Sequence, residues 1–284
     1  MNLTAYRSAN DFLQDVQGML EEREAENNLM LGVCLRMAKS SEEIEPAPYF
    51  ATVRQNDGIL IAAIMTPPQK LIVYGDTVAR VEAFKLLAAD LLAKGLPVPG
   101  VIGRSAAASA FAKAWEEVAG KSATQGMRQR VYKLTEVNKP ETPSGSFRAA
   151  TRDDLALLMH WTRTFHHEAV PNDPLPDVQG ATMRRIDRKD IFIWDNGGPV
   201  SMAARSRPTT NGVSVNLVYT PPEYRQRGYA TACVASLSQY LLDFGFSFCS
   251  LFANLANPVS NHLYQKIGYH PVCDFSQWRF VAKA

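Results

Sequence analysis

A short basic segment, Arg225-Gln226-Arg227-Gly228-Tyr229-Ala230, has the residue types and spacing of an anion-binding turn. It lies between a strand-like run, residues 213–219, and a helix-like run that begins at Tyr229. Free N–H groups and the positive end of the dipole attract anions to the N-terminus of a helix. Gly228 lets a ligand approach the backbone without an intervening Cβ, and Thr231 adds a hydroxyl donor in the first helical turn. The segment predicts a site for a phosphorylated ligand, although an arginine-rich turn can also simply begin a surface helix.

A second group of polar residues follows the predicted strand 246–252. Asn257 precedes Pro258, which is the usual order of an N-cap and a first helical residue. Ser260 and Tyr264 lie on the helix that this cap begins, residues 258–267, and Gly268 ends it. Tyr264 borders the apolar face of that helix, where it is either a chemically active phenol or a core tyrosine with a satisfied hydroxyl.

The elements that must position these residues occur in two similar series. Residues 138–146, rich in proline and glycine, predict a linker between a first domain, 1–137, and a second, 147–284. In each half a strand ends in Thr-Pro-Pro, at 66–68 and at 220–222, and further strands and helices follow in the same order. We interpret this as an internal repeat, with convergence on a common α/β order as the alternative. The first half continues from its Thr-Pro-Pro into a strand, residues 69–74, so only the second half keeps the turn.

Apolar periodicity predicts the following elements. The first half has strands 49–54, 59–65, 69–74, 98–102 and 127–135 with helices 78–94 and 106–118; the second has strands 147–149, 190–194, 200–207, 213–219, 246–252 and 275–281 with helices 153–170, 229–244 and 258–267.

The two motifs together resemble those of the GNAT superfamily of N-acetyltransferases. The family's acetyl-CoA signature, Gln/Arg-x-x-Gly-x-Gly/Ala, is matched by Arg225 to Ala230, and its Leu-Tyr-x-Lys-x-Gly-aromatic pattern by Leu263 to Tyr269. Residues 146–281 carry the resemblance, and the first half resembles a degenerate copy, as in tandem GNAT proteins. The resemblance implies an α+β fold with two GNAT-like domains, each a mixed, mostly antiparallel twisted sheet flanked by helices. A splayed strand pair in the C-terminal domain would hold CoA.

The resemblance also implies roles for individual residues. Backbone groups of Val218 and Tyr219 would bind the pantetheine arm, and the signature, Arg225 to Thr231 (Arg225, Gln226, Arg227, Gly228, Tyr229, Ala230 and Thr231), would hold the pyrophosphate. Asn257 and Ser260 would contact the other side of the cofactor. Tyr264 would protonate the thiolate of CoA as an amine attacks the thioester.

One departure concerns the base. Many members of the family carry a glutamate on the strand before the signature, whereas residues 213–219 contain no acid. Candidates are His166, His167 and Glu168 at the end of the predicted helix 153–170, of which Glu168 is preferred. A solvated last turn, with histidines that complement the helix dipole, is the alternative. Asp153 and Asp154 are predicted to begin that helix and not to act as catalytic carboxylates.

Composition limits the classes of partner. Thirty basic and 28 acidic residues are interspersed and give a net charge of +2, which predicts neither a nucleic-acid groove nor a membrane-binding surface. The four cysteines, Cys34, Cys233, Cys249 and Cys273, show no CxxC pairing and no nearby histidine pattern. They are typical of reduced core thiols in a cytoplasmic protein, so no metal site is expected.

Two classes of function remain open from the sequence. The first is an acetyl-CoA-dependent N-acetyltransferase acting on the amine of a small molecule, with a protein N-terminus or lysine as another possible acceptor. The second is a non-catalytic module that senses acyl-CoA or binds other proteins on a tandem GNAT scaffold. A homodimer is compatible with both.

Overall fold

A computed structural model describes residues 1–40, 45–75, 81–171, 173–175 and 177–282. The chain forms two compact units that are not contiguous in sequence. Unit 1 comprises Met1–Val131, Asn254–Ala256 and Val272–Ala284, and unit 2 comprises Tyr132–Ala253 and Asn257–Pro271. The sequence predicts two consecutive domains, 1–137 and 147–284, and these boundaries stay a prediction.

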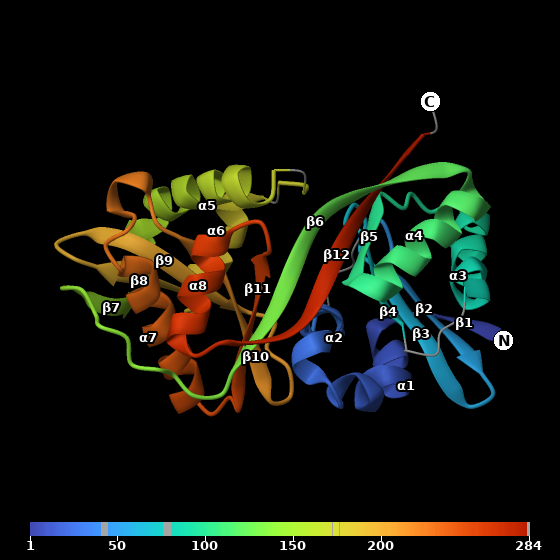
Figure 1. Cartoon of the computed structure of the whole chain (residues 1–284), viewed down its shortest axis with the longest axis horizontal. Helices are drawn as coiled ribbons and strands as arrows, with labels where there is room; N and C mark the ends of the chain where they lie inside the picture. Colours follow the sequence, from blue (N-terminus) through green and yellow to red (C-terminus); the bar gives the residue numbers. More distant parts are fainter. Residues whose placement is uncertain (41–44, 76–80, 172, 176, 283–284) are drawn as a thin grey trace. The chain divides into compact units, whose positions relative to one another are not determined.

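Unit 1 is a mixed sheet covered by helices on both faces (Figure 1). Its strands are β1 (Asn2–Tyr6), β2 (Tyr49–Gln55), β3 (Gly58–Met65), β4 (Leu71–Gly75), β5 (Gly100–Arg104), β6 (Lys121–Leu134) and β12 (His270–Ala282), and its described helices are α1 (Ala9–Glu21), α2 (Glu24–Ala38), α3 (Val81–Ala93) and α4 (Ser105–Ala119). The strand order is β1-β2-β3-β4-β5-β12-β6. Strands β1 to β4 pair antiparallel, β4 and β5 pair parallel, and β12 pairs antiparallel with β5.

Strand β3 of this sheet is apolar on both sides, which explains the two helical layers. Along β3, Ile61 and Ala63 pack into the core beneath α3 and α4, whereas Ala62 and Ile64 pack into the core beneath α1 and α2. Successive side chains of a strand point to opposite faces, so a continuous apolar run requires a covering layer on each face.

Unit 2 repeats this plan. Its strands are β7 (Ser146–Ala149), β8 (Ile191–Asp195), β9 (Pro199–Ser206), β10 (Gly212–Tyr219) and β11 (Phe248–Asn254), and its described helices are α5 (Leu155–Ala169), α6 (Val178–Asp187), α7 (Tyr229–Asp243) and α8 (Pro258–Ile267), with 3-10 turns η1 (Arg152–Asp154) and η2 (Pro222–Tyr224). Strands β7 to β10 pair antiparallel and β10 pairs parallel with β11, as β4 does with β5 in unit 1. The shared strand order and directions agree with an internal repeat.

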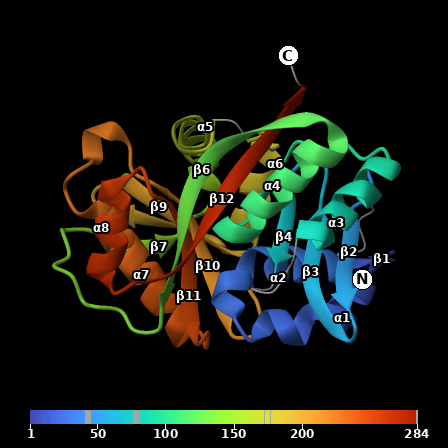
Figure 2. The same cartoon turned by 45° about the vertical axis from the view of Figure 1, so that its right-hand side comes forward.

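The helices of unit 2 divide between two cores. Residues of α7 and α8, with Val213 and Val215 of β10, form one core, and residues of α5 and α6, with Leu217 and Tyr219, form the other. Figure 2 shows α7 and α8 in front of the strands and α5 behind them. The site described below therefore has α7 and α8 on one face of its sheet and α5 on the other.

Three sequence expectations differ from the structure. The last strand was expected within the second half, but β12 from Val272 onward belongs to unit 1, because its partner β5 is distant in sequence. Strand β1 and the separate helices α1 and α2 were not foreseen. Glu24, an acidic residue of a type that is usually exposed, is only 7% exposed at the start of α2. The predicted beginning of the helix 78–94 lies outside the described residues.

Candidate active site in unit 2

The anion-binding turn predicted from the sequence connects β10 to α7. After η2, Arg225 is extended, Gln226 has φ of 62° and Gly228, the N-cap of α7, has φ of 82°. A left-handed residue before the first helical turn is favourable only for glycine, so Gly228 determines where α7 begins. The side chains of Gln226 and Arg227 are exposed, whereas that of Tyr229 is buried and accepts a hydrogen bond from Asn196 (2.7 Å).

The N-terminus of α7 retains donors for a ligand. The helix begins with no side-chain cap, and Ala232 N donates its hydrogen bond to Gly228 O (2.9 Å). Within the described part of the chain, no protein acceptor is found for the N–H groups of Gly228 to Thr231. A Cβ on Gly228 would lie 3.6 Å from Pro143 Cδ, so steric room exists and the backbone conformation is the constraint. Unsatisfied donors at an exposed helix N-terminus are the arrangement that holds phosphate groups.

Strands β10 and β11 separate next to this turn. Their parallel ladder joins Gly212–Ser214 with Phe248–Ser250, which are the first three residues of each strand. On the other side, β10 gains one residue relative to β9, because Asn216 faces Ala204 and the next pair is Tyr219 with Met202. Leu217 lies in this bulge with φ of 52°. Val218 and Tyr219 therefore lie beyond the end of the β10–β11 ladder, in the part of β10 that leads to the turn before α7.

Helix α8 carries Tyr264 into the core that α7 and α8 form with Val213 and Val215 of β10. The predicted cap is confirmed: Asn257 Oδ1 accepts a hydrogen bond from Ser260 N (3.1 Å), and the helix runs from Pro258 to Ile267. Tyr264 is 8% exposed, and its ring packs against Tyr132 (6.3 Å between centroids) and Tyr269 (6.0 Å). Among the described residues its hydroxyl has no hydrogen-bond partner. Burial raises the pKa of Tyr264 to about 12, because desolvation disfavours the phenolate.

Comparison with known proteins identifies this part of the chain. Residues 155–269 match the family model described as "Acetyltransferase (GNAT) family", and they include the turn, the separated strands and Tyr264. This part of the chain belongs to the GNAT family. No curated protein sequence matches that of the chain significantly.

Solved structures extend the likeness of fold beyond the GNAT domain to nearly the whole chain. An acetyltransferase of the GNAT family from Colwellia psychrerythraea is 14% identical, with a TM-score of 0.59 over 99% of this chain and 100% of that one. A GCN5-related N-acetyltransferase from Sphaerobacter thermophilus is 18% identical, with a TM-score of 0.63 over 98% and 95%. A tandem GNAT protein from the clavulanic acid biosynthesis pathway is 13% identical, with a TM-score of 0.58 over 100% and 99%. Residues 155–269 thus form a GNAT acetyltransferase domain, and the fold shared with these solved structures extends over nearly the whole chain.

The structure brings together two residues that the sequence assigned to different roles in the GNAT domain. Arg225 Nη2 donates to both carboxylate oxygens of Glu168 (3.1 and 2.8 Å), and Arg225 Nε donates to Thr220 O (2.9 Å). The guanidinium lies 5.8 Å from the ring centre of Tyr219. The contact occupies both oxygens of the Glu168 carboxylate. The catalytic role of Glu168 stays a prediction, as does phosphate binding by the side chain of Arg225.

The other candidate bases lie on the last turns of α5. His167 is exposed, whereas His166 is half-buried and its Nε2 has no hydrogen-bond partner among the described residues. Within those residues, no cluster of three His, Cys, Asp or Glu side chains could hold a metal ion, and no helix is long and apolar enough to cross a membrane.

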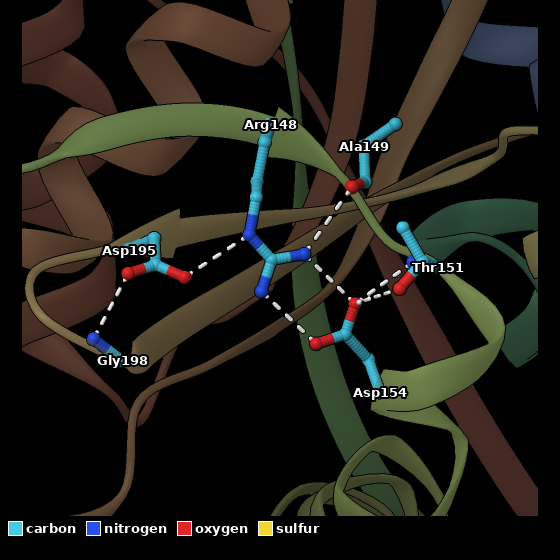
Figure 3. A network of polar contacts seen from close by, with 6 residues as sticks. All are labelled: Arg148, Ala149, Thr151, Asp154, Asp195 and Gly198. Carbon is cyan, nitrogen blue, oxygen red and sulfur yellow. Dashed lines mark hydrogen bonds and ion pairs between the residues drawn. The ribbon is translucent and has the colours of Figure 1, made fainter.

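A polar network that was missed in the sequence fixes the start of α5 in unit 2 (Figure 3). Arg148 on β7 donates to both carboxylate oxygens of Asp154 (2.8 and 3.0 Å) and to Asp195 at the end of β8 (3.0 Å). Asp154 also accepts from Thr151 N (2.8 Å) in a capping box, so its predicted role at the helix start is confirmed. The Arg148 guanidinium lowers the pKa of Asp154 below its usual range. The network ties α5, and with it Glu168, to two strands.

Proposed function

We propose that the GNAT domain transfers the acetyl group of acetyl-CoA to the primary amine of a small molecule, with Tyr264 as the general acid. The observation that carries the proposal is a combination of three features in one unit: N–H groups at the start of α7 and a phenol on α8 that have no hydrogen-bond partner among the described residues, and strands that separate beside them. The family match supports acyl-CoA-dependent acetyl transfer, and the acceptor class and the role of Tyr264 are our inference.

The donors on this chain fit the parts of an acyl-CoA. The N–H groups of Arg227 to Thr231 would bind the pyrophosphate, as unsatisfied donors at a helix N-terminus do. Backbone groups of Val218 and Tyr219, which lie beyond the β10–β11 ladder, would bind the amides of the pantetheine arm as an added strand would. Asn257 and Ser260 would contact the opposite side.

In the proposed reaction the amine nitrogen attacks the carbonyl carbon of the thioester and the carbon–sulfur bond breaks. The electron pair leaves with sulfur, the Tyr264 hydroxyl gives its proton to the thiolate, and the proton lost by nitrogen passes to water. A pKa of about 12 keeps all but about one in 10⁵ Tyr264 side chains protonated at pH 7. The burial that raises this pKa also raises that of a thiol leaving beside it, which keeps the proton transfer feasible.

Two measurements test this proposal. Acetyl-CoA should raise the melting temperature of the protein, and incubation with acetyl-CoA plus a panel of amines (phenethylamine, glucosamine, spermidine and lysine) should release free thiol only when an amine is present. Binding without release by any of these amines or by a lysine-containing peptide would favour the sensing function instead. Absence of a melting shift with any acyl-CoA would refute both functions.

A further inference from the structure

One polar side chain on β10 is not used by the rest of the protein. Asn216 immediately precedes the bulge at Leu217, and within the described residues its side-chain Oδ1 has no hydrogen-bond partner. Its Oδ1 is buried, so the missing partner is not bulk water. A buried polar group without a partner is unfavourable, and native proteins retain few of them without a function.

A second such group lies on the neighbouring strand. Ser250 is fully buried on β11, at the last rung of the β10–β11 ladder, and its Oγ also has no partner among the described residues. Opposite it on β10, Ser214 differs, because its hydroxyl accepts a hydrogen bond from Arg207 Nη2 (2.9 Å). The unsatisfied oxygens therefore occur where the two strands separate, and not throughout this part of the sheet.

Both groups face the α5 side of the sheet. Val213, Val215, Cys249 and Leu251 pack with α7 and α8, so the alternating residues between and beyond them, Asn216 and Ser250 included, point to the other face. On that face Tyr219 packs against Trp161 of α5 (6.1 Å between ring centres).

The bulge fixes the direction of the Asn216 side chain. Between Asn216 and Tyr219, β10 advances three residues while β9 advances two, and Leu217 adopts a left-handed conformation that is costly for a branched apolar residue. Such strain persists where the surrounding structure enforces it, and bulges beside active sites commonly redirect a side chain.

We propose that the amide of Asn216 binds the acceptor amine, with its Oδ1 accepting one N–H of the attacking nitrogen, and that Ser250 Oγ forms the second polar contact. This inference rests on the proposed function. An amide oxygen holds an N–H without removing the proton, so Asn216 positions the nitrogen and its lone pair, and the proton still leaves to water. A primary amine supplies one N–H for Asn216 and another to lose, whereas a secondary amine has only one. Asn216 thus selects primary amines.

Two variants with the same branching and the same number of side-chain heavy atoms separate this role from a structural one. Asn216→Leu removes the acceptor, and Asn216→Asp keeps an acceptor oxygen in the same place. With the amine of the panel that the wild type acetylates fastest, we expect Asn216→Leu to lower kcat/KM for the amine about tenfold, as the loss of one hydrogen bond of typical strength does. Asn216→Asp should retain more activity, and KM for acetyl-CoA should not change. Asn211→Ala, in the exposed turn before β10, is the control and should behave as the wild type.

Selectivity and stability give two further readouts. The ratio of kcat/KM for the primary amine to that for its N-methyl derivative should fall in Asn216→Leu, and in the same direction in Ser250→Ala. The melting temperature of Asn216→Leu should not fall, because the variant removes an unsatisfied buried group. Unchanged kcat/KM and an unchanged ratio in Asn216→Leu, with an active wild type, would overturn this inference alone. A wild type without amine-dependent thiol release would overturn the proposed function, and this inference with it.

Discussion

Replacement of Tyr264 by phenylalanine tests the proposed chemistry most directly. The change removes only the hydroxyl, and the ring contacts with Tyr132 and Tyr269 are kept. Because the hydroxyl has no protein partner among the described residues, the free energy of unfolding should change by less than about 0.5 kcal/mol. Any large effect on turnover can then be assigned to the reaction.

The expected size follows from the role of a general acid. Such a group contributes about 10²–10⁴ to the rate, or roughly 3–5 kcal/mol of barrier. We therefore expect kcat of Tyr264→Phe to fall at least about 100-fold. The Kd for acetyl-CoA should change less than about threefold, because the proposed binding groups are the backbone at the start of α7 and the end of β10.

The assay combines thiol release under saturating acetyl-CoA and amine with calorimetric titration of acetyl-CoA. Tyr240→Phe, on the exposed side of α7, is the matched control and should leave both quantities unchanged. A fall in kcat of less than about threefold would refute the assignment of Tyr264 as the acid. A loss of affinity as large as the loss of turnover would assign Tyr264 to binding.

Three further predictions concern the turn, the network around α5 and the ion pair. Gly228→Val should weaken acetyl-CoA binding, measured by calorimetry, at least about tenfold. Valine disfavours the left-handed φ of 82°, so the backbone would shift and displace the N–H groups. The control is Gly245→Ala, a left-handed position at the other end of α7, which should lose stability but not affinity. Arg148→Met should lower the free energy of unfolding in urea by about 2 kcal/mol, a value reduced for partial exposure of the arginine. The pKa of Asp154 is lowered in the folded state, so this contribution is present above its unfolded value of about 3.9 and is lost as pH falls through the folded value; an equal difference at pH 7 and pH 2 would contradict the assignment. Glu168→Gln should lower kcat/KM for the amine less than about fivefold, because Arg225 occupies both oxygens of the carboxylate. A loss of 100-fold or more would identify Glu168 as the base.

The turn and the caps of unit 2 could be predicted because they depend on neighbouring residues. Gly228 allows a left-handed residue before α7, and Asn257 with Pro258 begins α8 at the expected position. Both features depend on backbone conformations that a few adjacent residues determine. The helices and strands that were predicted for unit 2 lie within a few residues of their observed bounds, since each has its own apolar period.

Contacts between distant residues could not be predicted in this way. Arg225 and Glu168 are 57 residues apart, and Arg148 and Asp195 are 47 apart. Nothing in the local sequence indicates that these charges meet. The bulge after Asn216 depends on the register of β9 against β10, and register is set by packing across the whole sheet.

The sequence by itself determined the type of chemistry. An anion-binding turn and a phenol at family-like spacing indicated an acyl-CoA site, since a glycine turn and a helix start require only adjacent residues. Tertiary structure alone decided which groups are available to a ligand. It satisfies Ser214 and pairs Arg225 with Glu168, and it leaves Asn216 Oδ1 and Ser250 Oγ without hydrogen-bond partners among the described residues. Whether a polar group is satisfied depends on every element packed around it, and only the folded chain sets those neighbours.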